Sequence, residues 1–218
     1  MERNDASSSA GERMGFIYRM VQVLAPRLWR IRGSLEVIGR QNLPATGPFL
    51  LIANHQSLLD PILIQSAVPR PVYTMAKSTQ FAAPILGLIM PRIHAFPVRR
   101  YQVDPQSVRI ALRLLRQGRG VAVYIEGERT WNGHLQEPRR GTVRLALRAG
   151  VPIIPTTIRG SYDAWPRWDR RPWPAAVRIR FMEPIELPAV RGARNRRLVT
   201  ETADLIMRAL RSGITDSV

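Results

Sequence analysis

The sequence predicts a single α/β domain with a mixed, largely parallel β-sheet flanked by helices, and an amphipathic helical segment at the N-terminal side. From about Gly33 onward, short apolar runs alternate with stretches of helical periodicity, the pattern of parallel sheets. The 218 residues, of which 45% are hydrophobic, suffice for one domain with a substantial core. The chain shows neither an internal repeat nor a long linker.

The apolar runs place seven strands, at Ser34–Ile38, Phe49–Ala53, Val72–Ala76, Ile93–Val98, Val121–Ile125, Ile153–Ile158 and Val177–Met182. Five helices are predicted between and after them, at Pro61–Ala67, Thr79–Ile89, Pro105–Gln117, Thr142–Ala149 and Asn195–Arg211. The third helix carries an apolar stripe opposite three arginines, and Gly118 ends it.

Three regions follow from this pattern. Residues 1–12 are polar and rich in Ser and Ala, which predicts a disordered leader without a signal peptide. Residues 13–32 predict an amphipathic helical segment that Pro26 would kink. Its arginines and Trp29 suit a membrane interface, but the same amphipathicity also suits packing on the core, and both alternatives stay open. Residues 33–218 form the predicted main domain, and no stretch is long and apolar enough to predict a spanning helix.

The composition indicates an anionic partner. The 33 basic residues exceed the 16 acidic ones, for a net charge of +17, and Lys77 is the only lysine. Arginine binds phosphate well, so a phospholipid surface, a phosphorylated substrate and nucleic acid are all candidates. The absence of cysteine excludes disulfides, thiolate metal sites and cysteine nucleophiles. His94 and His134 lack metal-ligand spacing with His55, so no metal or other cofactor is predicted.

Polar clusters follow three of the predicted strands. Asn54-His55 follows the second strand, Arg99-Arg100 the fourth, and Glu126-Gly127-Glu128-Arg129 the fifth. In a parallel sheet these clusters share one edge, where ligands bind. Asp60 lies five residues after His55, so its carboxylate can hold one ring nitrogen while the other accepts a proton. The sequence therefore predicts chemistry on the hydroxyl group of a phosphate-bearing substrate.

The motifs resemble those of the lysophospholipid acyltransferase family, typified by 1-acyl-sn-glycerol-3-phosphate acyltransferase. The first is Asn-His followed, after four residues, by Asp, here in Asn54–Asp60; the second ends in an arginine, here in Ala95–Arg100. The third resembles Phe-Pro-Glu-Gly-Thr-Arg and stands here in Tyr124–Arg129, and the fourth is the apolar, proline-bearing strand Val151–Pro155. The resemblance covers roughly residues 34–187.

Four positions depart from the family pattern. Ile125 replaces the usual Pro and Glu128 the usual Thr, while Arg99 stands where an acidic residue is frequent and Tyr101 where Gly is. The motif residues that carry the reaction are all present. The departures therefore bear on the acceptor headgroup more than on the chemistry.

The resemblance implies transfer of a fatty acyl group from acyl-CoA or acyl carrier protein to lysophosphatidic acid, giving phosphatidic acid. His55 would be the general base and Asp60 its partner. A covalent acyl-enzyme is not expected, because the chain lacks a Gly-x-Ser-x-Gly elbow and cysteine. The predicted location is the cytoplasmic face of an anionic membrane, as a peripheral (monotopic) protein.

The resemblance also implies a set of substrate-binding residues. Arg100 and Arg129 would bind the acceptor phosphate, and Glu126 would orient an arginine or the glycerol hydroxyls. Gly127 would let backbone amides approach the phosphate. The remaining candidate contact is Asn54.

Structural alternatives accompany several of these roles. Asp60 could cap the helix that begins at Pro61, and Ser57 could be a second cap. Ser78–Pro91 is expected to be mainly a core helix rather than a wall of an acyl groove or a membrane-facing patch. The Trp- and Arg-rich stretch Tyr162–Pro174 could contact a membrane interface, stack on nucleic-acid bases or fold against the core.

Two further alternatives concern the function itself. The same chemistry could act on a different lysophospholipid or a lyso-aminolipid. A non-catalytic nucleic-acid-binding domain would explain the charge, but it would give His55 no role and leave the four ordered motifs unexplained. No nucleic-acid partner is therefore predicted.

Overall fold

The computed structural model describes residues 15–99, 104–187 and 195–215. The helices and strands, in chain order, are α1 (Phe16–Arg32), β1 (Ser34–Ile38), the 3-10 helix η1 (Arg40–Asn42), β2 (Phe49–Ala53), α2 (Asp60–Ala67), β3 (Val72–Lys77), α3 (Ser78–Phe81), α4 (Pro84–Arg92), β4 (Ala95–Val98), α5 (Pro105–Arg116), β5 (Gly120–Tyr124), α6 (Arg140–Ala149), β6 (Ile153–Arg159), α7 (Ser161–Ala164), β7 (Ala176–Phe181) and α8 (Arg196–Thr215). The predicted leader 1–12 and Arg100 lie outside the described residues.

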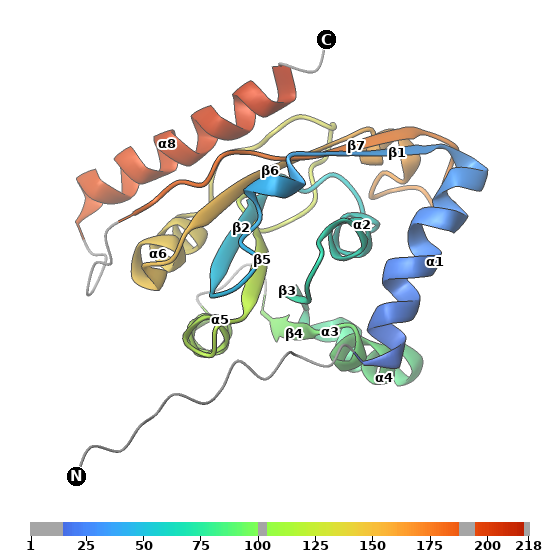
Figure 1. Cartoon of the computed structure of the whole chain (residues 1–218), viewed down its shortest axis with the longest axis horizontal. Coiled ribbons are helices and arrows are strands. Elements are labelled where there is room, and N and C mark those ends of the chain that lie inside the picture. Colours follow the sequence, from blue (N-terminus) through green and yellow to red (C-terminus); the bar gives the residue numbers. More distant parts are fainter. Residues whose placement is uncertain (1–14, 100–103, 188–194, 216–218) are drawn as a thin grey trace.

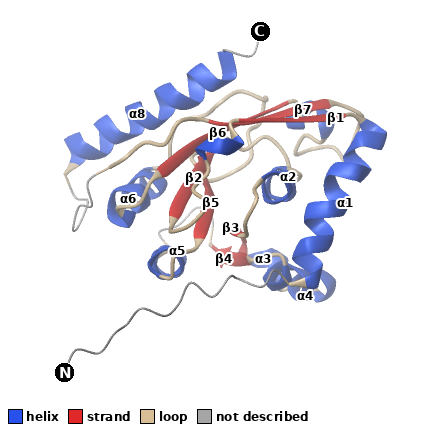
Figure 2. Cartoon of the chain, viewed as in Figure 1, coloured by secondary structure: helices blue, strands red, loops and turns tan. Residues whose placement is uncertain are grey.

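The strands form one seven-stranded sheet in the order β1-β7-β6-β2-β5-β3-β4. Neighbouring strands run parallel except β6 and β7, which are antiparallel, so the sheet is mixed and largely parallel as predicted. The central strands β2 and β5 are buried along their whole length, because helices cover both faces of the sheet. Helices α5, α6 and α8 lie on one side, and α1 and α2 lie on the other (Figures 1 and 2).

The core has two parts because side chains alternate across the sheet. In β2, Leu50 and Ile52 pack with the first group of helices, whereas Phe49, Leu51 and Ala53 pack with the second. The third predicted helix, α5, begins at Pro105 as expected, and Asp104 caps it by accepting hydrogen bonds from the amides of Gln106 and Ser107.

Helix α1 has one face packed on the domain and another apolar face exposed. Tyr18 is fully buried, and its hydroxyl accepts a hydrogen bond from the Val72 amide at 3.1 Å. Trp29 is also buried, whereas Leu28 and Ile31 expose 61% and 80% of their surface. The helix therefore packs on the domain with one face and presents apolar side chains to solvent with another.

The prediction that Ser78–Pro91 is a core helix is wrong. The segment forms two helices, α3 and α4, and neither has a buried residue. Ile85 is 73% exposed and Leu88 63% exposed. Pro84 lies at the start of α4, where its missing amide costs no hydrogen bond, so it favours a new helix at this position.

Candidate active site

The histidine–aspartate pair lies where the sequence predicted, at the carboxyl end of β2. His55 and Asp60 are both buried, and 2.7 Å separates His55 Nδ1 from Asp60 Oδ2. With Nδ1 donating to the carboxylate, Nε2 is the nitrogen that a neutral imidazole offers as proton acceptor. The pair thus has the geometry that a general base requires.

Asp60 holds the loop between β2 and α2 as well as the histidine. Its Oδ2 also accepts hydrogen bonds from the backbone amides of Gln56 and Ser57, each at 2.7 Å. Asp60 is the first residue of α2, and its other oxygen, Oδ1, is buried without a hydrogen-bond partner among the described residues. The alternative that Asp60 is a helix cap is therefore wrong, because its carboxylate faces back toward the histidine.

The Ser57 side chain has a structural role, holding the loop before α2. It is fully buried, and its hydroxyl donates to the Trp165 carbonyl at 2.8 Å while accepting from the Leu59 amide at 3.2 Å. Its hydrogen bond to Leu59 supports the local turn before α2. A hydroxyl so enclosed and so engaged is unsuited to attack a substrate.

Glu126 reaches the same place from the adjacent strand. In the β2–β5 register Ala53 pairs with Tyr124, so His55 and Glu126 lie at the same level, two residues beyond that pair. Glu126 Oε1 accepts a hydrogen bond from the His55 amide at 3.1 Å. Burial away from water raises the pKa of Glu126 to about 7; the His55 hydrogen bond opposes this shift, and the nearby negative charge of Asp60 adds to it. Its other oxygen is buried without a hydrogen-bond partner among the described residues.

Tyr124 is a further residue of the site, which the sequence motifs did not single out. Its ring stacks on the His55 imidazole, with the ring centroids 3.9 Å apart and an interplanar angle of 16°. The stack and the Asp60 hydrogen bond together fix the plane of the imidazole. The contact depends on the register of β2 and β5, which the sequence pattern does not specify.

Asn54 and Gly127 have conformational roles in the structure. The Asn54 side chain donates to the Ile158 carbonyl at 2.9 Å and accepts from the Ile158 amide at 2.8 Å, so it ties the end of β2 to β6. Gly127 has φ +72°, and its amide donates to the Tyr124 carbonyl. The left-handed turn requires glycine at this position. That Gly127 lets backbone amides approach a phosphate stays a prediction.

The basic residues divide between two places. Arg129 is half-buried in the loop after β5. Arg99 follows β4, which β3 separates from β5, so the clusters share one edge but span several strand spacings of about 4.8 Å each. Arg139 donates from Nη2 to Glu128 at 2.9 Å and from Nε to the Glu126 carbonyl at 3.1 Å, so it belongs to the loop after β5.

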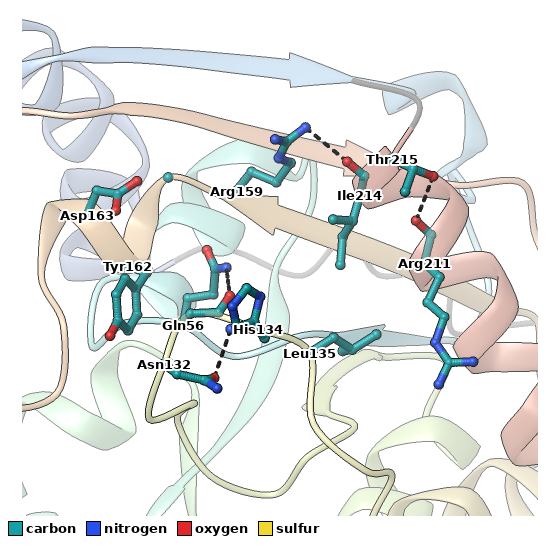
Figure 3. A pocket seen from close by; sticks show the side chains of 12 residues that line it. Gln56, Asn132, His134, Leu135, Arg159, Tyr162, Asp163, Arg211, Ile214 and Thr215 are labelled. Carbon is teal, nitrogen blue, oxygen red and sulfur yellow. Dashed lines mark hydrogen bonds between the residues drawn. The ribbon is translucent and has the colours of Figure 1, made fainter. Parts of the chain in front are cut away.

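A hollow of about 590 Å³ adjoins the loop that follows β5. Gln56, the neighbour of His55, lines it and donates from its side chain to the Gly133 carbonyl at 2.8 Å. Figure 3 shows Gln56 beside His134, with Tyr162 on one side and Ile214 from α8 on the other. His55 does not line this hollow, so the hollow lies beside the His55–Asp60 pair and does not enclose it.

The fold and the site define an α/β protein with a buried histidine–carboxylate pair at the carboxyl edge of its parallel strands. Residues 34–159 match the model of the Acyltransferase family, which covers more than half of the chain. The chain belongs to the Acyltransferase family. The resemblance inferred from the motifs is thereby confirmed.

Individual relatives point the same way. The 1-acyl-sn-glycerol-3-phosphate acyltransferase of Bacillus subtilis is 30% identical over 131 residues, covering 60% of this chain and 65% of that protein. Its alpha counterpart from Mus musculus is 32% identical over 179 residues, covering 78% of this chain and 60% of that protein. The chain thus matches slightly less than two thirds of each relative's length.

A solved structure shares the fold. The crystal structure of the 1-acyl-sn-glycerophosphate acyltransferase PlsC from Thermotoga maritima superposes with a TM-score of 0.75 at 23% identity, covering 91% of this chain and 80% of that one. The likeness confirms the α/β architecture with a mixed sheet. None of the helices in the described part of this chain has the length and hydrophobicity needed to cross a bilayer.

Proposed function

We propose that the protein transfers a fatty acyl group from acyl-CoA or acyl carrier protein to the free hydroxyl of lysophosphatidic acid, giving phosphatidic acid. The observation that carries this proposal is the buried His55–Asp60 pair, set in the Asn54–Asp60 motif of an Acyltransferase family member. The names of the relatives from Bacillus subtilis and Mus musculus support the acceptor.

In the proposed mechanism, His55 Nε2 accepts the proton of the acceptor hydroxyl as its oxygen attacks the thioester carbonyl carbon. A C–O bond forms, the C–S bond breaks, and the thiolate takes the proton back from the imidazolium. Asp60 stabilises the imidazolium through Nδ1, and Tyr124 keeps the ring in plane. General-base catalysis of this kind contributes on the order of 10²–10⁴-fold.

The transfer is proposed to be direct, without an acyl-enzyme. Ser57, the hydroxyl residue of the motif, is buried and engaged at its hydroxyl by Trp165 and Leu59. The chain has no cysteine that could form a thioester. We propose that Arg129, with Arg100 from outside the described residues, binds the acceptor phosphate, and that Asn54, Glu126 and Gly127 shape the loops that hold the site.

We also propose that the enzyme works on the surface of an anionic membrane, on the cytoplasmic side. The exposed apolar side chains of α1 and α4 would enter the interface. These helices meet where Tyr18 of α1 stacks on His94, just after α4, with the ring centroids 4.7 Å apart. The net charge of +17 would strengthen adsorption to anionic lipids.

The acceptor and the donor are tested together. Purified protein is given oleoyl-CoA or oleoyl-acyl carrier protein and, in separate reactions, lysophosphatidic acid and lysophospholipids with choline, ethanolamine or glycerol headgroups. We expect turnover to be fastest with lysophosphatidic acid, with phosphatidic acid as the product. Turnover confined to another headgroup would reject the acceptor, and no turnover with either donor would reject the function.

A further inference from the structure

Glu128, the residue that departs from the threonine of the family motif, lies between two guanidinium groups. Its Oε1 is 2.9 Å from Arg139 Nη2, and its Oε2 is 3.6 Å from Arg167 Nη1. The side chains of Glu128 and Arg167 expose only 13% and 17% of their surface. Because solvent screens such a sheltered pair less than an exposed one, the contact is stronger than an ordinary surface ion pair.

Arg167 contacts two more residues of the same loop. Its Nη1 donates to the Arg129 carbonyl at 3.1 Å, and its guanidinium carbon lies 3.3 Å from the centroid of the Trp131 ring. One arginine from the Trp- and Arg-rich stretch after α7 thus binds a carboxylate, a carbonyl and an aromatic face of the loop after β5. A planar guanidinium serves all three contacts at once, which a lysine ammonium does not.

The other side of this loop is attached to the catalytic histidine. The Thr130 amide donates to the His55 carbonyl at 2.8 Å. Residues 128–131 are therefore held between Arg167 on one side and His55 on the other. Arg129, the proposed phosphate ligand, lies in the middle of this held segment, so its backbone position relative to His55 depends on Arg167.

We propose that Glu128 and Arg167 are positioning residues that fix Arg129 for the phosphate of the acceptor, an inference that rests on the proposed function. Glu128 pairs one carboxylate oxygen with each of Arg167 and Arg139, which turns both guanidinium groups toward itself and leaves Arg129 as the arginine offered to the phosphate. The threonine usual in the family has no charge to do this. The pair thereby sets the affinity for a phosphate-bearing lysolipid, while His55 and Asp60 keep their own contacts.

The test is the steady-state kinetics of Arg167→Ala, Arg167→Lys and Glu128→Gln with lysophosphatidic acid and oleoyl-CoA. We expect Arg167→Ala to raise KM for the acceptor about tenfold, with KM for the donor unchanged and kcat within about twofold. Arg167→Lys keeps the charge beside Glu128 but loses the planar stack, so it should restore part of the affinity. Glu128→Gln should raise the acceptor KM as well.

Arg178→Ala is the matched control, because Arg178 forms an ion pair with Glu36 at 2.6 Å between β7 and β1, away from the loop after β5. Its acceptor KM should equal that of the unmodified protein. Acceptor KM values unchanged in all three loop variants, or a loss confined to kcat, would overturn the inference while the unmodified protein still turns over. A failure of the proposed function shows differently, as absence of turnover in the unmodified protein and in Arg178→Ala alike. If Arg167→Ala does not fold, the other two variants decide.

Discussion

At the scale of single residues, one carboxylate oxygen organises the site. Asp60 Oδ2 accepts from His55 Nδ1, from the Gln56 amide and from the Ser57 amide, all at 2.7 Å. The oxygen that orients the imidazole is therefore the same one that shapes the loop carrying it. Asp60→Ala would remove both the hydrogen bond to the imidazole and those to the loop amides. Asp60→Asn keeps an oxygen acceptor for the loop amides and removes the negative charge beside the imidazole, so it tests the charge more selectively.

Because the pKa of Glu126 is raised, this residue makes the folded protein less stable as the pH rises. Its pKa is about 7 in the folded protein against 4.5 ordinarily, so the unfolded chain ionises first as pH rises. The contribution of Glu126 to folding is thus fully present below pH 4.5 and is lost as pH rises toward 7, a loss on the order of 3 kcal/mol.

The matching prediction uses Glu126→Gln, whose amide stays neutral and still accepts from the His55 amide. The free energy of unfolding of Glu126→Gln, relative to that of the unmodified protein, should be higher at pH 8 than at pH 5. The reason is that only the unmodified protein has a carboxyl at this position that ionises as the pH rises. Urea unfolding of both proteins at the two pH values measures the difference. An equal response of both proteins to pH would show that Glu126 does not carry this burial cost.

The sequence predicted the local His55–Asp60 pair and the meeting of the His55 and Glu126 motifs at one sheet edge, but not which other long-range side chains contact them. His55 and Asp60 are five residues apart, so the motif alone brings them together. Tyr124 reaches the imidazole through strand register, and Arg167 reaches Glu128 from a loop 39 residues further along the chain. Composition and periodicity do not encode such pairings, which depend on how the sheet assembles.

At the scale of elements, α1 and α4 show what periodicity leaves open. A stripe of apolar residues marks a face that avoids water, but it does not state whether protein or lipid covers that face. Tyr18 and Trp29 show that α1 is anchored on the domain, while Leu28 and Ile31 remain exposed. The strands were predicted more accurately, because their apolar runs are short, bounded and buried on both faces.

The exposed face of α1 gives a prediction about membrane binding. Leu28→Glu and Ile31→Glu should each weaken binding to vesicles containing phosphatidylglycerol by about tenfold, because each replaces an inserted apolar side chain by a charge that anionic lipid repels. Leu205→Glu on α8 is the control, since Leu205 is a partly exposed leucine on a different helix. Co-sedimentation with vesicles measures the binding. Equal loss in all three variants would indicate a charge effect without a role for α1.

At the scale of the whole molecule, the sheet order decides which motifs meet. Strands β2 and β5 are neighbours at the centre, so the histidine and glutamate motifs are adjacent although 71 residues separate His55 from Glu126. Helices α1 and α4, which carry exposed apolar side chains, lie on the other side of the molecule from α8 (Figure 1). The proposed catalytic edge and the proposed lipid-binding surface are therefore separate parts of the molecule.

The most direct measurement of the central claim is acyl transfer from oleoyl-CoA to lysophosphatidic acid by the unmodified protein and by His55→Ala, with phosphatidic acid identified by mass spectrometry. The account predicts turnover by the unmodified protein and a kcat lower by at least about 10²-fold in His55→Ala. Circular dichroism and thermal unfolding should show that the variant remains folded. Equal turnover by the folded variant would contradict the assignment of His55 as the general base.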